Sequence, residues 1–251
     1  MAAAAAVAGA QTGGPVKDPD LIGLTTTSVL EKDKAQVGVQ VNSFGASDNL
    51  LRAGFSFGYG FGNNFQARIA STFSAFDSFG LASGNNIRYG GSAGDFLVKY
   101  RLRGTIDTAL ELGIGYSDTP AQEQVLETVA SLSAGYAVTD GVRLYVNPKL
   151  VTLLDNPLFA VGVGAVVDVA PGISLFGDWT PYVSGNNTLS TTDGSMDKDQ
   201  LYAVGIRFTK LWPGLTLDLA YTNIVGETYG FSLTPSLGNT GGLYVGLAYG
   251  F

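Results

Sequence analysis

The sequence predicts an all-β fold, a single transmembrane antiparallel up-and-down β-barrel of about twelve strands. Three observations lead to this prediction. Apolar residues recur at every second position, the connections between these stretches alternate in length, and the chain ends in a strictly alternating stretch. In residues 243–251 every odd position is large and apolar, and every even position except Tyr244 is Gly or Ala. Because successive side chains of a strand point to opposite faces, one face of this strand is wholly apolar.

The same period of two recurs from Ala35 onward and defines the strands that we expect. They cover residues 35–44, 50–61, 65–75, 94–103, 105–116, 124–138, 142–153, 158–169, 173–183, 200–210, 214–224 and 242–251. Each has about ten residues, the length that a tilted strand needs to cross a bilayer.

The predicted connections fall into two sets. Tight turns are expected at residues 62–64, 104, 139–141, 171–172 and 212–214, where Gly, Asn and Pro provide suitable turn chemistry. Long loops are expected at residues 76–93, 184–199 and 225–241. Short turns at one rim and long loops at the other are typical of a membrane barrel, and an even number of strands places both termini on the short-turn side.

Two prolines fall on the apolar parity of predicted strands. Pro148 and Pro181 each remove a donor from the hydrogen-bonded ladder. We therefore expect a bulge or a local break at both positions.

The first 33 residues lack strand alternation and divide in two. Residues 1–10 are rich in Ala and end in Ala-Gly-Ala, like the end of a secretory signal peptide, but they lack a basic region. An Ala-rich tail is the alternative. Residues 11–33 predict an N-terminal periplasmic extension or a plug segment, with a short helical or plug-like stretch around residues 20–30. The barrel then covers residues 34–251.

The apolar face of the strands is predicted to face lipid. About twelve strands with four or five bulky residues each would overfill an interior, since small barrels already close with about eight strands. The opposite face mixes Gly and Ala with isolated charges, which is too few charges for a solvated surface. No charge falls on the apolar face, where a basic residue at the bilayer midplane costs roughly 2–4 kcal/mol.

Aromatic residues near the strand ends support this orientation. Bands of aromatic side chains at both membrane interfaces are typical of such barrels. Those beside the short turns are Phe61, Phe65, Tyr136, Phe208, Trp212 and Phe251, and those toward the long loops are Phe44, Tyr116, Trp179 and Tyr221.

The C-terminal stretch, with Phe251 last and apolar residues at alternate positions before it, resembles the C-terminal strand signature of bacterial outer-membrane β-barrel proteins of the porin-like class. The Thr-rich residues 25–39 also resemble the lead-in to the first strand of such barrels. The resemblance implies an integral protein of the Gram-negative outer membrane with both termini periplasmic. Its partners would be outer-membrane lipid and the barrel-assembly machinery, which reads the C-terminal strand.

Composition limits the chemistry. The chain has no Cys and no His, and its net charge of −7 argues against a nucleic-acid partner. The outer-membrane enzymes of similar size, a phospholipase, lipid A-modifying enzymes and a surface protease family, use a catalytic His. We therefore expect no enzyme, no catalytic residue and no cofactor, although composition leaves a Ser–Lys or paired-carboxylate site open.

Two acidic residues are candidates for a pair of catalytic carboxylates. Asp107 and Glu111 are four residues apart on one strand face, about 13 Å, which exceeds the separation used in glycoside hydrolysis. Ion pairs with Arg101 and Lys99 across Gly104 are the expected role. Residues 193–199 form an acidic loop without metal-ligand spacing, where weak binding of calcium is the alternative, and we expect no metal site.

Charged residues at inward positions are the candidate functional residues, because they would line the lumen. The basic set is Arg52, Arg68, Lys99, Arg101, Arg103, Arg143, Lys149 and Arg207, and the acidic set is Asp107, Glu111, Glu127, Asp168, Asp178 and Asp218. This near balance leaves open a cross-linked interior or a water-filled pore. The basic residues at 52, 68, 99, 101 and 103 would form one positive wall that draws anions into a pore.

The sequence thus predicts a channel for passive diffusion of small hydrophilic solutes, with a mild preference for anions. The alternative is a non-conducting structural or anchoring barrel that binds a partner through its long loops or its N-terminal extension.

Overall fold

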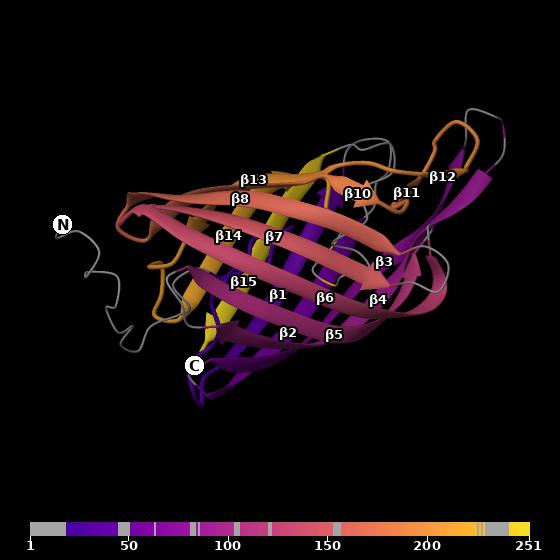
Figure 1. The fold of residues 1–251 in the computed structure, drawn as a ribbon. Helices are drawn as coiled ribbons and strands as arrows, with labels where there is room; N and C mark the ends of the chain where they lie inside the picture. Colours follow the sequence, from indigo (N-terminus) through magenta and orange to yellow (C-terminus); the bar gives the residue numbers. More distant parts are fainter. Residues whose placement is uncertain are drawn as a thin grey trace.

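Twelve antiparallel strands close into a barrel in the computed structural model of the chain (Figure 1). The structure describes residues 19–44, 51–62, 64–80, 84, 86–102, 106–119, 122–152, 157–224, 226, 228 and 241–251. The barrel strands are β1 (Ala35–Phe44), β2 (Leu51–Gly62), β3 (Phe65–Gly80), β4 (Asn86–Leu102), β5 (Asp107–Thr119), β6 (Gln122–Thr139), β7 (Val142–Thr152), β8 (Leu158–Ala170), β9 (Ile173–Thr180), β13 (Leu201–Phe208), β14 (Leu215–Thr222) and β15 (Gly242–Gly250).

Three short strands lie in the connection between β9 and β13. The strand β10 (Tyr182–Ser184) pairs with β8, and β11 (Thr188–Leu189) pairs with β12 (Met196–Asp197) in a small separate hairpin.

The ring closes through the two ends of the barrel sequence. The first strand, β1, pairs with the last, β15, in a register that sets Val39 opposite Leu247. Ala35 and Phe251 exchange two backbone hydrogen bonds of 2.9 Å at the end of this pair. The closed barrel that the sequence predicts is confirmed.

One predicted loop is wrong. Residues 76–93 were expected to form a long loop, but β3 continues to Gly80 and β4 begins at Asn86, with Asp77 paired to Tyr89 beyond a register shift. Strand pairing needs only backbone groups, so the ladder extends beyond the stretches in which apolar and polar residues alternate regularly. The resulting hairpin projects past the barrel at the end opposite the chain termini (Figure 1).

Both prolines interrupt strand pairing, as predicted. Pro181 separates β9 from β10. Opposite Pro148 the pairing of β6 with β7 is interrupted between Ser131 and Ala134 without a change of register. The Nδ2 of Asn147 donates to the carbonyl oxygen of Leu132 at 3.1 Å, so this carbonyl, which lies opposite Pro148, still accepts a hydrogen bond.

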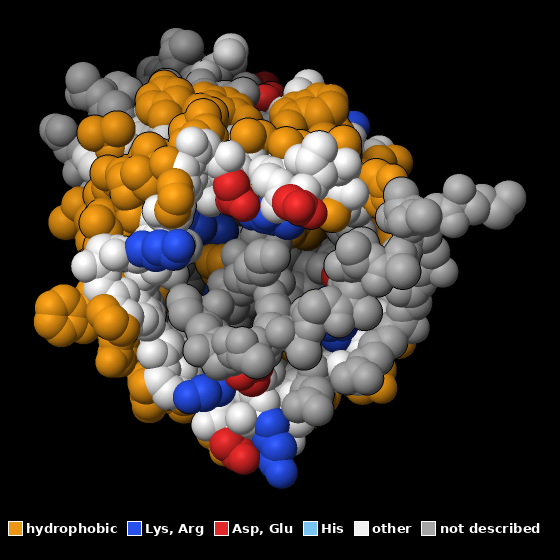
Figure 2. Space-filling model, turned by 90° about the vertical axis from the view of Figure 1, so that its left-hand side faces the viewer, with side chains coloured by type: hydrophobic (Ala, Val, Ile, Leu, Met, Phe, Trp, Pro, Cys, Tyr) orange, Lys and Arg blue, Asp and Glu red, His pale blue; other side chains and the backbone are white. Residues whose placement is uncertain are grey.

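The outer face of the barrel is apolar. Exposed large hydrophobic side chains occur on every barrel strand, for example Val39, Ile114 and Leu247, with 52, 55 and 40% of their surface exposed. Viewed at the short-turn end, apolar side chains cover the outer surface, and charged side chains gather around the mouth (Figure 2). Within the described residues, no helix is long and apolar enough to span a membrane. A closed ring of strands with this exterior is suited to lipid, because every strand pairs on both edges.

The predicted interface aromatics lie on this exterior. Phe61, Phe65, Tyr136, Trp179, Trp212 and Phe251 are exposed, and Phe208 is half-buried. Near the short turns the rings contact one another, with centroid separations of 5.8 Å for Phe61 and Phe65 and 6.0 Å for Tyr249 and Phe251. Their role at the membrane interface stays a prediction.

The apolar exterior allows a test of how deep in the bilayer a given position lies. Leu112 lies midway along β5, and Ile106 precedes this strand at the short-turn rim; both are exposed. We expect Leu112→Arg to lower the free energy of unfolding in lipid vesicles by about 2–4 kcal/mol, and Ile106→Arg by at most about 1 kcal/mol, because the cost of a basic residue depends on depth. Denaturant titration measures both variants. Equal losses would show that the bilayer does not surround the barrel at this height.

Candidate functional site

The inward faces of the strands carry most of the predicted lumen residues. Fully buried are Arg52, Lys99, Lys149, Arg207, Glu111, Glu127 and Asp178. Half-buried are Arg68, Arg101, Arg143, Asp107 and Asp218, whereas Asp168 is exposed at the short-turn rim. Arg103 lies outside the described residues. The structure thus describes where these side chains lie, and their role in selectivity stays a prediction.

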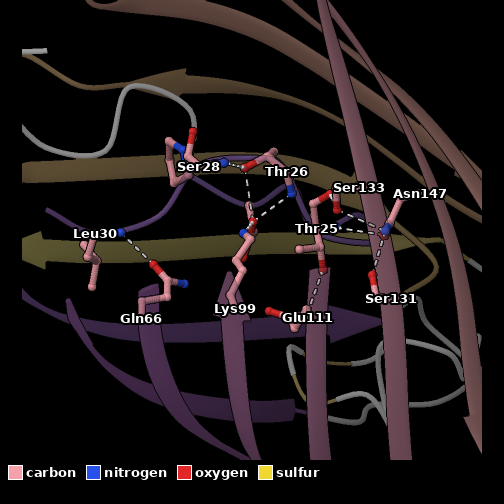
Figure 3. A network of polar contacts seen from close by, with 12 residues as sticks. Thr25, Thr26, Ser28, Leu30, Gln66, Lys99, Glu111, Ser131, Ser133 and Asn147 are labelled. Atoms are coloured by element: carbon pink, nitrogen blue, oxygen red, sulfur yellow. Dashed lines mark hydrogen bonds and ion pairs between the residues drawn. The ribbon is translucent and has the colours of Figure 1, made fainter. Parts of the chain in front are cut away.

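The lumen is occupied by the chain's own N-terminal residues. Residues 19–34, here called the lumen segment, run inside the barrel and bury Leu21, Leu24, Thr26 and Leu30 among others (Figure 3). The segment is irregular, with bends and a turn at residues 32–33, so of the two alternatives expected around residues 20–30, helical or plug-like, it does not form the helix. Residues 1–18, including the predicted signal-peptide remnant, lie outside the described residues.

An ion pair fixes the start of the lumen segment. The Nζ of Lys99, on β4, lies 2.8 Å from Oδ1 of Asp20, and Lys99 is only 1% exposed. The same oxygen accepts the Thr26 backbone N–H at 2.8 Å and its hydroxyl at 3.2 Å, which folds the segment back on itself. Glu111, the predicted partner of Lys99, lies opposite it in the ladder. The ion pair that the structure describes for Lys99 is nevertheless with Asp20, which corrects the expectation.

Three wall side chains donate to backbone carbonyl oxygens of the lumen segment. Arg207 donates from its two Nη atoms to Pro19 and Asp20, each at 3.0 Å, and binds Asp218 at 2.7 Å. Lys149 donates to the carbonyl of Gly23. The hydroxyl of Ser133 donates to the carbonyl of Thr25 at 2.7 Å.

Three other wall side chains accept from backbone N–H groups of the segment. Asp178 Oδ2 accepts from Gly23 at 3.4 Å, and Asn147 Oδ1 accepts from Thr25 at 3.1 Å. The Oε1 of Gln66 accepts from Leu30 at 2.7 Å.

A side-chain contact joins this set, because Thr25 Oγ1 donates to Glu111 Oε1 at 3.1 Å. Figure 3 shows Gln66, Lys99, Glu111 and Asn147 reaching the segment from several strands. A buried backbone group needs such a partner, so the wall holds the segment in one register.

The segment leaves the lumen along β2. Asp33 donates its N–H to the carbonyl of Gly60, and Gly60 donates its N–H to the carbonyl of Lys34, both at 2.9 Å. A side chain at Gly60 would collide with the carbonyl oxygens of Leu30 and Glu31. Glycine is therefore required where the segment approaches this strand.

Apolar contacts complete the lumen core. Leu21, Ile22 and Leu24 belong to one buried cluster with wall residues. A Cβ at Gly164 would lie 3.0 Å from Leu21 Cδ1 and 3.3 Å from Leu24 Cδ1, so the bare backbone of β8 provides the room for these leucines.

Two further ion pairs lie near the short-turn rim. Arg101 binds Asp107 at 2.8 Å, as predicted, and Arg143 binds Asp168 through two bonds of 2.9 Å. Lys99 and Arg101 are thus both paired with carboxylates. The predicted positive wall is therefore compensated at two of its five positions in the described conformation, and its position 103 is outside the described residues.

The segment leaves part of the lumen unfilled. A cavity of about 130 Å³ lies between it and the strands β1, β2, β14 and β15. Its lining includes Gln36, Ser56, Arg68, Thr216, Asp218 and Tyr244. This volume holds several water molecules.

Sequence reasoning missed several lumen residues. Asp20 belongs to the lumen segment, and Gln66 and Asn147 bind it from the wall. Only the inward parity of positions 66 and 147 could have indicated the two wall residues. Asp95 was also missed. Its Oδ1 and the Oε1 of Glu127 lie 2.5 and 2.7 Å from where a Cβ at Gly115 would stand, so these carboxylates converge above that glycine.

The acidic loop has no feature of a metal site. In the part of the chain that the structure describes, no group of three or more His, Cys, Asp or Glu side chains converges. Hydrogen bonds from the backbone and the hydroxyl of Ser195 hold the pKa of Asp193 below its usual range.

Comparison with known proteins gives the fold. No protein-family model matches the chain, and no curated protein matches it. Among solved structures, the NanC porin matches with a TM-score of 0.59 and 9% identity over 85% of this chain and 98% of that one. The KdgM porin gives 0.56 and 9% over 87% and 99%, and its complex with disordered oligogalacturonate gives 0.57 and 9% over the same shares. The chain has the twelve-stranded barrel fold of outer-membrane porins.

The ion pair at the start of the segment can be tested. We expect Asp20→Asn to raise the hydrogen-exchange rates of the Thr25 and Leu30 amides about tenfold or more, because a charge-assisted bond to buried Lys99 is lost. The amides of β4 and β5 should keep their rates. Asp33→Asn is the matched control, since Asp33 lies in an exposed turn and its side chain accepts only from the Tyr59 hydroxyl among the described contacts. Unchanged rates in Asp20→Asn would mean that the ion pair does not hold the segment.

Proposed function

We propose that the chain is an outer-membrane channel for passive diffusion of small hydrophilic solutes and that the lumen segment closes it in the described conformation. The observation that carries this proposal is that the barrel wall does not fill its own lumen. Gly38, Gly58, Gly60, Gly162 and Gly164 stand at inward positions, and the space beside them holds the lumen segment or the cavity. Removal of a separable segment would therefore leave an open, polar passage.

The porin fold supports this assignment. Two of the structures with the same fold carry the name porin, NanC and KdgM. The lumen wall of this chain is lined by charged and amide side chains, which suits hydrated solutes. The chain has no His or Cys, and we assign no catalytic residue.

We propose the orientation of an outer-membrane barrel. The apolar exterior would contact outer-membrane lipid, and the short turns and both termini would face the periplasm. The C-terminal strand β15, which ends beside Phe251, would be the part that the assembly machinery reads.

The preference for anions would belong to the open state. When the segment leaves, Lys99 loses Asp20, and Lys149 and Arg207 lose the carbonyl oxygens of residues 19–23. Lys99 and Lys149 would then face the passage, whereas Arg101, Arg143 and Arg207 keep their carboxylate partners Asp107, Asp168 and Asp218. Exposed positive charge in a narrow passage concentrates anions.

A non-conducting barrel is the second candidate. The observation that favours it is the number of buried contacts between segment and wall, which include the apolar cluster around Leu21 and Leu24. In that case the segment is a permanent core, and the loops serve a partner.

A disulfide lock separates the two candidates. A Cβ at Gly135 would lie 3.2 Å from Thr27 Oγ1, an atom that marks where the sulfur of a cysteine at this position could stand, so cysteines at both positions are within reach of a disulfide. The chain contains no other cysteine. We expect the oxidised Thr27→Cys/Gly135→Cys protein to be silent in planar bilayers and to recover its openings on reduction. The two single variants are the controls.

Two results of the lock experiment would count against the proposal. Steps that persist in the oxidised protein would show that the lumen segment does not close the pore. Silence of both the reduced protein and a folded variant without residues 19–33 would favour the non-conducting barrel.

Selectivity is tested in the variant without residues 19–33. We expect larger single-channel steps with an anion preference in a salt gradient, and a shift of the reversal potential toward cation preference in Lys99→Gln/Lys149→Gln. Arg143→Gln is the matched control and should change the reversal potential little, because Arg143 is neutralised by Asp168 at the rim. An equal shift in the control would contradict the assigned role of the two lysines.

A further inference from the structure

We propose that the lumen wall is a binding site for the backbone of bent peptides and that the lumen segment, which turns back on itself between Asp20 and Thr26, occupies it as an internal peptide. This inference rests on the proposed function and names oligopeptides as the solute class. It goes beyond closure of the pore, because it says which groups of the wall recognise a ligand and which chemical feature of the ligand they read.

The wall contacts the backbone of the segment more than its side chains. Gly23, Thr25 and Leu30 donate their N–H groups to Asp178, Asn147 and Gln66. The carbonyl oxygens of Pro19, Asp20, Gly23 and Thr25 accept from Arg207, Lys149 and Ser133. Only Asp20 and Thr25 add side-chain bonds to the wall in the described network.

This arrangement matches a peptide and does not match other small solutes. Along residues 19–30 the wall offers both acceptors and donors, and at Gly23 and Thr25 it binds both backbone groups of one residue. A peptide repeats one donor and one acceptor per residue, whereas a sugar carries hydroxyl groups and no such repeat. Backbone contacts give affinity without demanding a sequence, as when a peptide adds to a sheet edge.

Two side-chain features would add selectivity. Lys99 binds the carboxylate of Asp20 in a site where the lysine is almost fully buried, so an acidic residue is favoured there. The room at Gly162 and Gly164 receives Leu21 and Leu24, which favours apolar residues shortly after the acidic one. The preferred ligand is therefore a peptide that can turn as residues 20–26 do and has an acidic residue followed by apolar residues.

The lumen segment is joined to the barrel in a way that permits exchange. It continues into β1 through residues 31–34, a turn in which Lys32, Asp33 and Lys34 are exposed. Between residues 19 and 30 the described contacts with the wall are side-chain hydrogen bonds, one ion pair and apolar packing. All of these can be replaced by equivalent contacts with a second peptide.

The experiment measures binding of a fluorescent peptide with the sequence of residues 19–30 to the variant without residues 19–33, in detergent, by anisotropy. The same peptide N-methylated at the amides of Gly23, Thr25 and Leu30 keeps every side chain and loses three donors. We expect at least a tenfold loss of affinity from this methylation. A peptide with Ala at the positions of Ser28 and Val29, the two residues of the stretch 21–30 that are only half-buried, should bind within about threefold of the parent, because its backbone is unchanged.

Wall variants separate backbone from side-chain recognition. Gln66→Leu should weaken the parent and the Ala-substituted peptide by the same factor, since Gln66 binds only the Leu30 N–H in the described contacts. Lys99→Met should remove the preference for the parent over a peptide with Asn at the Asp20 position and leave the Asn peptide unaffected. Arg143→Gln, at the rim, should change neither affinity.

A second preparation takes the place of the variant without residues 19–33 if that variant fails to fold. The full chain carries a specific protease site inserted in the exposed turn between Lys32 and Asp33, is folded first and is then cut. The labelled peptide should exchange for the cleaved segment in the folded barrel.

The outcomes are distinct. Equal affinity of the N-methylated and parent peptides, or loss of binding by the Ala-substituted peptide alone, would overturn the proposal, because the wall would then read side chains of this one segment. No binding in either preparation would also overturn it. Binding without conductance would contradict the proposed channel and leave the peptide binding site standing, since anisotropy does not depend on a pore.

Discussion

The whole structure depends on the requirement that every backbone N–H and C=O of a strand in a bilayer finds a partner inside the protein. Twelve strands meet it by closing, and the closing pair joins β1 to β15, the two ends of the barrel sequence. Closure creates an outer face that must be apolar and an inner face that lipid cannot reach. The inner face can carry Lys99, Glu111, Lys149 and Arg207 only because of this enclosure. Those charges must then be satisfied within the lumen.

The lumen segment satisfies them with its main chain. A barrel of this size can fill its interior with its own large side chains, but here β1, β2 and β8 present glycines to the lumen, and a segment of turns and bends takes the space. Lys149 and Arg207, which water would otherwise solvate, donate to carbonyl oxygens of residues 19–23. Asp20 brings the one carboxylate of the described segment network that neutralises a wall cation. The segment therefore replaces water inside the barrel, which is the property expected of a closed passage.

The sequence predicted the barrel well, because lipid requires apolar side chains on the outer face, whereas the enclosed inner face carries polar ones. Apolar and polar residues therefore alternate along each strand. Strand limits agree closely for β1, β7 and β15, and most charged residues assigned to the lumen are there. The loop expected at 76–93 failed because alternation of bulky residues marks the membrane span and not the end of strand pairing. The contacts between the lumen segment and the wall could not be predicted from the sequence either. Asp20 is 79 residues from Lys99 and lies in a stretch without periodicity, so no spacing rule connects them.

How strongly the lumen segment closes the barrel depends on how each kind of contact changes when water replaces the segment. Hydrogen bonds between wall and segment exchange for bonds to water, so each favours the closed state by only about 0.5–1.5 kcal/mol. The apolar side chains have no such exchange: burial of Leu21 or Leu24 contributes about 1.5–3 kcal/mol each. The polar contacts thus set the register of the segment, and the two leucines with the Asp20–Lys99 pair decide how rarely it leaves. In the channel that we propose, the passage would be closed at rest without being permanently sealed, because its closed state depends on a few side chains of one short segment.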